Sequence, residues 1–113
     1  MILSLKDITR ITALGFKIKD FCYLDEQGFY RLRNVNGVCF FLKNRKCSIY
    51  EHRPIGCRFY PIIFDFENDQ AILDLDCPLI KEVSQERVRQ FEEKIREFVF
   101  LLFRERVERK QLD

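Results

Sequence analysis

Apolar residues recur at helical spacing near both ends of the chain and at strand-like spacing between them. At the N-terminal end the pattern predicts a short helix that Ser4 opens, with Asp7 as its capping-box partner and Gly15 as its stop. A second short helix is expected from about 19 to 25. It carries Cys22 within an apolar patch, where we interpret this thiol as a small buried hydrophobe rather than a ligand.

Two hairpins are predicted in the middle of the chain. Residues 29–35 and 38–42 flank Asn36-Gly37, the pair favoured in a type I′ turn, and residues 43–46 form a loop. Pro54 starts a helical turn over 55–58 that Pro61 ends. The second hairpin pairs residues 62–67 with 70–75. Its inward apolar side chains are Ile62, Phe64, Phe66, Ala71, Leu73 and Leu75, and its outer face carries Asp65, Glu67, Asp74 and Asp76.

A long helix is predicted from Ser84 to about Lys110. Val83 and Val88 stand at the positions of a hydrophobic staple, which supports that start. Its centre, residues 98–103 (FVFLLF), is apolar all round, so it is buried on two sides or meets a second copy in a homodimer. The expected fold is therefore a single α+β domain over residues 1–113. Short N-terminal helices and two hairpins surround a cysteine-rich region at 37–78, and the C-terminal helix at 84–110 packs across them.

Composition narrows the class of protein. The 113 residues are 47% hydrophobic, and 20 basic against 18 acidic residues leave a net charge of +2. That charge is too small to indicate binding to nucleic acid or to an anionic membrane. No apolar run approaches the roughly 20 residues of a membrane span, and the start MILSLKD does not read as a signal peptide. We therefore expect a reducing, cytoplasmic location.

Four of the five cysteines fall in one half of the chain: Cys39, Cys47, Cys57 and Cys77. Stable disulfides are disfavoured in a reducing compartment, which leaves a metal or cluster site, or plain buried hydrophobes. Seven, nine and nineteen residues separate successive members, so no Cys-x-x-Cys pair is present, and spacing alone is a weak signal. Each cysteine does lie beside a predicted turn, strand end or proline. Thiolates select zinc, copper(I) or iron–sulfur clusters.

The charges around these cysteines favour the metal or cluster interpretation. Four thiolates around Zn²⁺ or a doubly positive iron–sulfur core leave a net charge of about −2, which nearby cations offset. Arg53 and Arg58 are expected to face the bound group and to lower the thiol pKa values. Basic residues of the loop at 43–46 are interpreted as solvated surface charges.

Other candidate chemistry is sparse. His52, the single histidine, has no second histidine or evident catalytic partner, so a role as ligand or proton carrier is the less favoured interpretation. No nucleophile elbow, phosphate-binding loop or paired-carboxylate signature is present, and the catalytic residues of any activity stay unknown. The acidic outer face of the second hairpin is interpreted as solvated.

Residues 37–61, GVCFFLKNRKCSIYEHRPIGCRFYP, resemble the YkgJ-type or CxxCxxCC family of zinc- or iron-chelating domains, often labelled iron–sulfur proteins. The pattern that carries the resemblance is G-x-C-x-F-L, a short polar loop, then C-x-I-Y-x-x-R-P-x-x-C-R-x-Y-P. Cys77-Pro78 is similar to the family's last cysteine, so the resemblance covers about residues 3–78. The family's N-terminal CxxCxxCC run is absent, and we expect in-frame codons upstream of Met1 to encode it.

The resemblance implies a metal- or iron–sulfur-binding protein whose ligands are Cys39, Cys47, Cys57 and Cys77. Electron transfer or support of an unidentified partner enzyme is the leading expectation. The alternatives are a structural zinc module that presents a protein-binding surface, and a metal-free remnant with buried cysteines. If the four thiols share a site, their sulfurs are expected to converge to about 4 Å even without metal.

Overall fold

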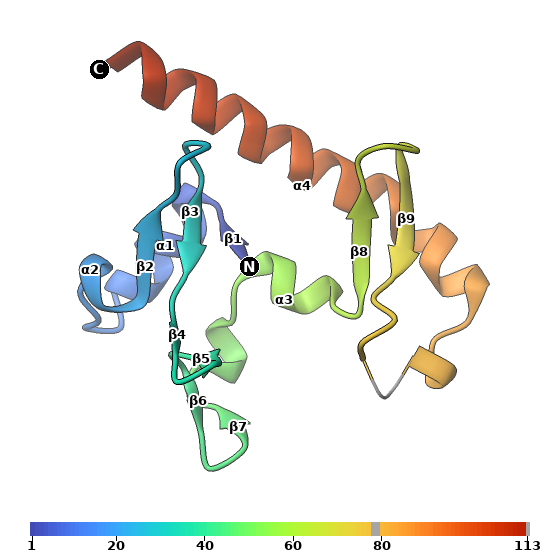
Figure 1. Ribbon diagram of the computed structural model, residues 1–113, viewed down its shortest axis with the longest axis horizontal. Helices are drawn as coiled ribbons and strands as arrows, with labels where there is room; N and C mark the ends of the chain where they lie inside the picture. The colour runs from blue at the N-terminus through green and yellow to red at the C-terminus, as the bar shows by residue number, and fades with distance from the viewer. Residues whose placement is uncertain (78–79, 113) are drawn as a thin grey trace.

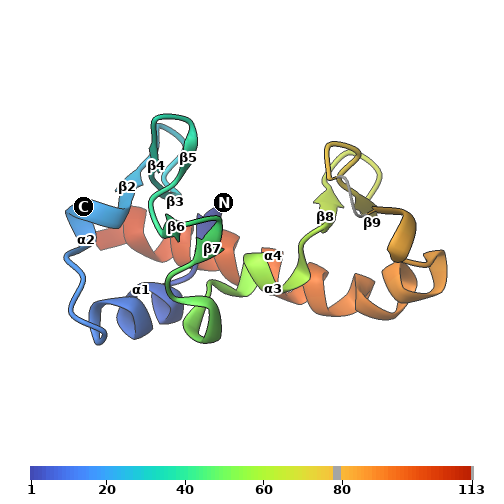
Figure 2. The same cartoon turned by 90° about the horizontal axis from the view of Figure 1, so that it is seen from below.

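The computed structural model describes residues 1–77 and 80–112 and has the predicted α+β architecture. A long C-terminal helix runs along one side of the molecule, and short antiparallel strand pairs lie beside it (Figure 1). The N-terminal elements lie near the C-terminal half of this helix. The predicted second hairpin lies near its N-terminal half, as a view from below also shows (Figure 2).

The N-terminal elements form a three-stranded antiparallel sheet and two short helices. The strand β3 (Tyr30–Leu32) lies in the middle and pairs with β1 (Ile2–Leu3) on one side and with β2 (Cys22–Leu24) on the other. The predicted capping box is confirmed: the Ser4 hydroxyl accepts from the Asp7 amide, and the Asp7 carboxylate accepts from the Ser4 amide. In chain order the elements are β1 (Ile2–Leu3), α1 (Leu5–Thr12), α2 (Ile18–Phe21), β2 (Cys22–Leu24) and β3 (Tyr30–Leu32).

The predicted helix over residues 19–25 is wrong in its second half. Helix α2 ends at Phe21, and Cys22–Leu24 is a strand that pairs with β3. The turn after it is held by Asp25, whose carboxylate accepts from the Gln27 and Phe29 amides. Cys22 nevertheless is buried in the hydrophobic cluster of this part of the chain, so its interpretation as a small core residue is confirmed.

The tight turn at Asn36-Gly37 is present, but the strands that flank it are shorter than predicted. Both residues have positive φ, 54° and 82°, as a type I′ turn requires, and they join β4 (Asn34–Val35) to β5 (Val38–Cys39). The predicted loop at 43–46 is a second small hairpin, β6 (Leu42–Lys43) and β7 (Lys46–Cys47). Its turn, at Asn44-Arg45, also has positive φ at both positions.

A helical turn and the second predicted hairpin follow. A 3₁₀ turn, η1 (Tyr50–His52), leads to Pro54, which is the N-cap of α3 (Ile55–Phe59). Strands β8 (Ile62–Asp65) and β9 (Gln70–Leu73) then pair antiparallel. Their inward side chains are confirmed within the strands, where Ile62 and Ala71 are buried. The prediction is wrong beyond the strand ends, because alternation stops there and Leu75 is 82% exposed and Phe66 is 59% exposed.

The long helix α4 (Gln85–Leu112) begins where predicted, after the 3₁₀ turn η2 (Ile80–Glu82). The Ser84 hydroxyl accepts from the Arg87 amide, and Val83 packs against the cluster that contains Val88, as the staple predicts. That cluster also holds Ile62, Ala71 and Ile95, so α4 and the β8–β9 hairpin share one small core.

Both halves of the molecule cover the apolar centre of α4. Phe103 packs edge-on against Phe29 of the N-terminal sheet and against Phe66 of the β8–β9 turn, and Val99 is buried. Phe100 stays 64% exposed. The segment is thus mostly buried within one chain, with a single aromatic residue left on the open side of the helix.

Candidate metal centre

Three of the four predicted ligands line one pocket. Cys39 ends β5, Cys47 ends β7 and Cys57 lies in the middle of α3, and the pocket between them has a volume of about 410 Å³. Three separate elements therefore bring together thiols that are eight to eighteen positions apart in sequence. The pocket is completed by Leu42, Tyr50, Arg53, Arg58 and Tyr60.

Two turns with positive φ set the positions of Cys39 and Cys47. Each thiol closes a two-residue hairpin, because Cys39 pairs with Asn34 and Cys47 pairs with Leu42. Between the hairpins Phe41 is almost fully buried, and its carbonyl accepts from the Ser48 amide at 2.7 Å. The buried phenyl ring thus anchors both hairpins to the N-terminal core, and the two cysteines pack against the same core.

The third thiol is positioned by close packing of α3 against the N-terminal strand. A Cβ at Gly56 would collide with the thioether sulfur of Met1, so a side chain at that position would displace the Met1 side chain from α3. The buried carboxylate of Asp7 accepts from the Ile55 amide at 3.1 Å, which ties the first turn of α3 to α1. Both contacts fix the backbone on which Cys57 stands.

The electrostatics of Cys57 differ from the prediction. Burial, together with the neighbouring Cys39 and Cys47, raises the pKa of the Cys57 thiol to about 11. Arg53 and Arg58 were expected to lower the thiol pKa values, and for Cys57 that expectation is wrong. The reason is that desolvation disfavours a thiolate and that three thiols in one pocket repel one another once ionised.

The two arginines do line the thiol pocket. The Arg53 guanidinium lies 4.2 Å from the centroid of the Tyr50 ring and donates to the Tyr50 carbonyl at 2.9 Å. Arg58 is exposed, and within the described residues it forms no ion pair. Their proposed contact with a bound group stays a prediction.

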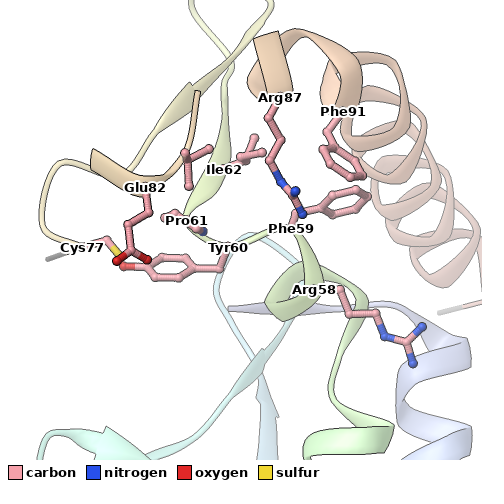
Figure 3. A pocket seen from close by; sticks show the side chains of 10 residues that line it. Arg58, Phe59, Tyr60, Pro61, Ile62, Cys77, Glu82, Arg87 and Phe91 are labelled. Carbon is pink, nitrogen blue, oxygen red and sulfur yellow. The ribbon is translucent and has the colours of Figure 1, made fainter. Parts of the chain in front are cut away.

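Cys77 belongs to a neighbouring pocket of about 460 Å³. There it lies beside the Tyr60 ring and the Glu82 carboxylate, while Arg58 points away from them (Figure 3). The Tyr60 hydroxyl donates to the Asp74 carboxylate at 2.7 Å, and the Cys77 amide donates to the Asp74 carbonyl at 3.1 Å. Tyr60 and Arg58 line both pockets, so they form the wall between Cys77 and the other three thiols. Pro78, which completes the predicted Cys-Pro pair, lies outside the described residues.

The thiol donors suit zinc or an iron–sulfur cluster by type, but their present arrangement is open. Within residues 1–77 and 80–112, no three histidine, cysteine or acidic side chains are close enough together to hold a metal ion. The expected convergence of four sulfurs without metal is therefore not seen. The role of the four cysteines as ligands stays a prediction, and binding requires the thiols to move together. Each thiol is free rather than disulfide-bonded.

His52 and Cys22 do not join the pocket. His52 is exposed at the end of η1, and its carbonyl accepts a long hydrogen bond from Arg10. Cys22 is buried on β2, where burial raises the pKa of its thiol. This separation leaves the sulfurs of residues 39, 47 and 57 as the only thiols on the walls of that pocket.

Two acidic residues that organise the site were missed in the sequence. Asp7 was recognised only as a capping residue, and Asp74 only as a solvated acid. A buried carboxylate holding α3 leaves no local sequence signal, since its partner Ile55 is 48 positions away. Asp74 carried a weak signal, because an Asp-x-Asp-Cys-Pro sequence favours a turn. Its side chain accepts from the Asp76 amide in such a turn.

Along the part of the chain that the structure describes, no helix has both the length and the apolar character needed to cross a bilayer.

Comparison with known proteins yields no matching curated protein and no matching solved structure. It does match residues 2–78, which hold all four thiols and their connecting elements, to the family described as "CxxCxxCC: Putative zinc- or iron-chelating domain". With two thirds of its length covered by that match, the chain belongs to the CxxCxxCC family.

Proposed function

We propose that the protein binds a zinc ion or an iron–sulfur cluster through Cys39, Cys47, Cys57 and Cys77. In this proposal the bound group serves electron transfer or supports a partner enzyme. The observation that carries it is the pocket lined by three thiols from three separate elements. Family membership supports metal chelation by such a chain.

The charges near the pocket support an anionic bound group. Arg53 and Arg58 line the pocket, and the β6–β7 hairpin that carries Cys47 also carries Lys43, Arg45 and Lys46, which do not line it. None of the five forms an ion pair within the described residues. Four thiolates around a 2+ centre carry a net charge of about −2, which these cations offset.

The test is a visible absorption spectrum with metal analysis on anaerobically purified protein. An iron–sulfur cluster gives broad charge-transfer absorption with iron and sulfide in the analysis, whereas zinc gives a colourless protein with one metal per chain. Cys57→Ser is expected to abolish binding in both cases. Cys22→Ser is the matched control, because that thiol is buried outside the pocket, and it should retain metal. Metal-free wild-type protein, or equal metal in Cys57→Ser, would refute the proposal.

Cys77 can bind the same metal as the other three thiols only if Tyr60, which separates it from them, moves aside. Tyr60→Phe removes the hydrogen bond to Asp74 and keeps the ring, so it should tighten four-thiol binding by about fivefold, the equivalent of one hydrogen bond. In a Cys77→Ser background the same change should have no effect. Equal effects in both backgrounds would show that Cys77 is not a ligand.

A structural zinc module is the second candidate, and one observation favours it. Cys39 and Cys47 pack against the main hydrophobic cluster, so metal bound there would also brace the core. A structural thiolate site couples metal binding to folding by on the order of 10 kcal/mol. Chelation that unfolds the whole chain would favour this candidate, and chelation that leaves α4 folded would favour a site kept for chemistry.

A further inference from the structure

A second groove, separate from the thiol pocket, is lined by apolar and cationic residues that take no part in the proposed metal site. It lies along the C-terminal half of α4, where the β2–β3 turn and the β8–β9 turn both approach the helix (Figure 1). Its volume is about 500 Å³, within the range of small-molecule sites. No residue lines both this groove, which we name the helix groove, and the thiol pocket.

The floor of the helix groove is apolar. Phe103 lies in its middle and packs edge-on against Phe29, at 5.5 Å between ring centroids, and against Phe66, at 5.8 Å. Val99 and Leu102 line the same floor from α4. Three aromatic rings from three elements therefore form one apolar cluster, in which Phe66 is 59% exposed, Phe103 is half-buried and Phe29 is buried.

One end of the helix groove is cationic. Arg31 is paired with Asp25 at 2.5 Å, but Arg106 and Lys110 form no ion pair or side-chain hydrogen bond within residues 1–77 and 80–112. Of the residues that the structure describes, none with an acidic side chain lines the groove. Two cations without an acidic partner at the end of an apolar floor are complementary to a ligand with one anionic head and an apolar body.

The Arg106 guanidinium is held in place without using its hydrogen-bonding edge. Its central carbon lies 4.8 Å from the ring centroids of both Phe29 and Phe103. Stacking on rings covers the flat faces of a guanidinium and leaves the N–H groups free for a carboxylate. Gly28 makes room for this arrangement, because a Cβ there would lie only 3.2 Å from the Arg106 side chain.

We propose that the helix groove binds a free fatty acid, with its alkyl chain on the phenylalanine floor and its carboxylate between Arg106 and Lys110. Two parallel hydrogen bonds from Arg106 meet the two carboxylate oxygens, and Lys110 adds a point charge. The groove is separate from the thiol pocket, so binding does not depend on metal.

The first test is calorimetric titration of the full chain with octanoate, decanoate and dodecanoate, each below its micelle concentration. Each pair of added methylenes is expected to tighten binding by about tenfold, since each buried methylene contributes a few-fold in affinity. Dodecanol should bind at least tenfold more weakly than dodecanoate, and dodecyltrimethylammonium should not bind. Equal binding of all three dodecyl probes would overturn the proposal, because it would reflect apolar adsorption without charge recognition.

Substitutions of basic residues along α4 give a second test. Lys110→Gln and Arg106→Gln are each expected to weaken dodecanoate binding by about tenfold, the loss of one charge-assisted interaction. Arg104→Gln is the matched control, because Arg104 is exposed on the same helix and does not line the groove. Unchanged dodecanol binding shows that each variant keeps the groove intact. Loss of dodecanoate binding in Arg104→Gln alone would overturn the assignment.

Two other occupants are distinguished by further measurements. Co-sedimentation with anionic phospholipid vesicles, without binding of free dodecanoate, would assign the surface to a membrane and overturn the proposal. A ligand-free dimer that Phe66→Ser dissociates would assign the groove to a second copy of the chain, with the same consequence. We expect the Cys57→Ser variant to bind dodecanoate with wild-type affinity. The fatty-acid proposal can therefore be tested independently of the metal proposal.

Discussion

At the scale of single residues, Asp7 has the greatest structural role. Its side chain is fully buried and accepts from the Ser4 amide, the Ile55 amide and the Arg10 guanidinium, at 2.7–3.1 Å. These contacts join the start of α1 to the start of α3, so a carboxylate far from the thiols in sequence orients the helix that carries Cys57. Such a carboxylate is tolerated because both of its oxygens accept hydrogen bonds.

Asp7→Ala is therefore expected to destabilise the fold by about 3 kcal/mol, the usual cost of removing one partner from a buried ionic and hydrogen-bonded network. The buried Ile55 and Ser4 amides lose their acceptor, and Arg10 loses its counter-ion. Urea unfolding of the metal-free protein measures the change. Glu26→Ala, which removes an exposed acid, is the control and should alter the free energy of unfolding by no more than about 0.5 kcal/mol. Equal values for the two variants would contradict the role given to Asp7.

The Cys57 thiol is expected to react slowly in metal-free protein. With a pKa of about 11, only about one molecule in ten thousand carries the thiolate at pH 7. Iodoacetamide labelling, followed by peptide mass spectrometry, should accelerate about tenfold per pH unit and level off near pH 11. In urea the reactivity should return to that of an ordinary cysteine. A half-maximal rate near pH 8.5 in the folded protein would contradict the effect of burial and of the neighbouring thiols.

The same shift has a consequence for folding. The folded-state pKa of Cys57 lies above its unfolded value, so the folded state holds the proton more tightly. That contribution to stability is fully present below the unfolded pKa of about 8.5 and is lost as the pH rises through the folded value of about 11. Chemical unfolding at rising pH should therefore become easier across this window, and much less so in Cys57→Ala.

At the scale of elements, the predictions succeeded where local chemistry determines the backbone. Asn36-Gly37 forms the expected turn because both positions need positive φ, and Ser84 starts α4 because its hydroxyl caps a free amide. The predictions failed where pairing with a distant segment determines the backbone conformation. Cys22–Leu24 is a strand because it pairs with β3, and the helical preference of three residues does not outweigh that pairing.

In the candidate site, too, contacts between residues distant in sequence were not predicted. The cysteines and the two arginines were found from the family pattern, but the wall that separates Cys77 from the other thiols was not. That wall depends on a hydrogen bond between Tyr60 and Asp74, fourteen positions apart, which no periodicity predicts. The positive φ values at Asn44 and Arg45 were also missed, because Asn-Arg is a weaker turn signal than Asn-Gly.

Cys57→Ser should loosen the cysteine-bearing elements and leave α4 formed. The hydrophobic cluster of α4 and the β8–β9 hairpin contains no cysteine, so it does not depend on the thiol pocket. Native-state hydrogen exchange of the variant, incubated with metal under the same conditions as the wild type, should show lost protection over residues 37–61 and retained protection over α4. Loss of protection throughout would favour the structural-zinc candidate. No change anywhere would make Cys57 a simple core residue.

At the scale of the whole molecule, α4 is the element that connects two otherwise separate cores. Its first half packs with β8 and β9, and its second half reaches the N-terminal sheet. Polar contacts fix the second half: the Leu5 amide donates to the buried Glu105 carboxylate at 3.0 Å, and Arg109 donates to the Gly28 carbonyl at 2.5 Å. The position of the N-terminal elements relative to the β8–β9 hairpin therefore depends on this helix, together with α3, whose Phe59 packs against Phe91 of α4.

The open face of α4 is expected to give weak self-association. Phe100 and Val107 stand seven residues apart, which is two helical turns, and are 64% and 50% exposed, so they form an apolar strip that the exposed Arg104 interrupts. Two residues bury far less than the roughly 800 Å² per partner of a stable interface, so a dimer should appear only at high protein concentration. Sedimentation velocity over a concentration series measures it. Phe100→Ser should remove the dimer, whereas Leu75→Ser, at an exposed position beside the first residue of α4, should not. A monomer at every concentration would show that the exposed strip on α4 is simply tolerated by the isolated chain.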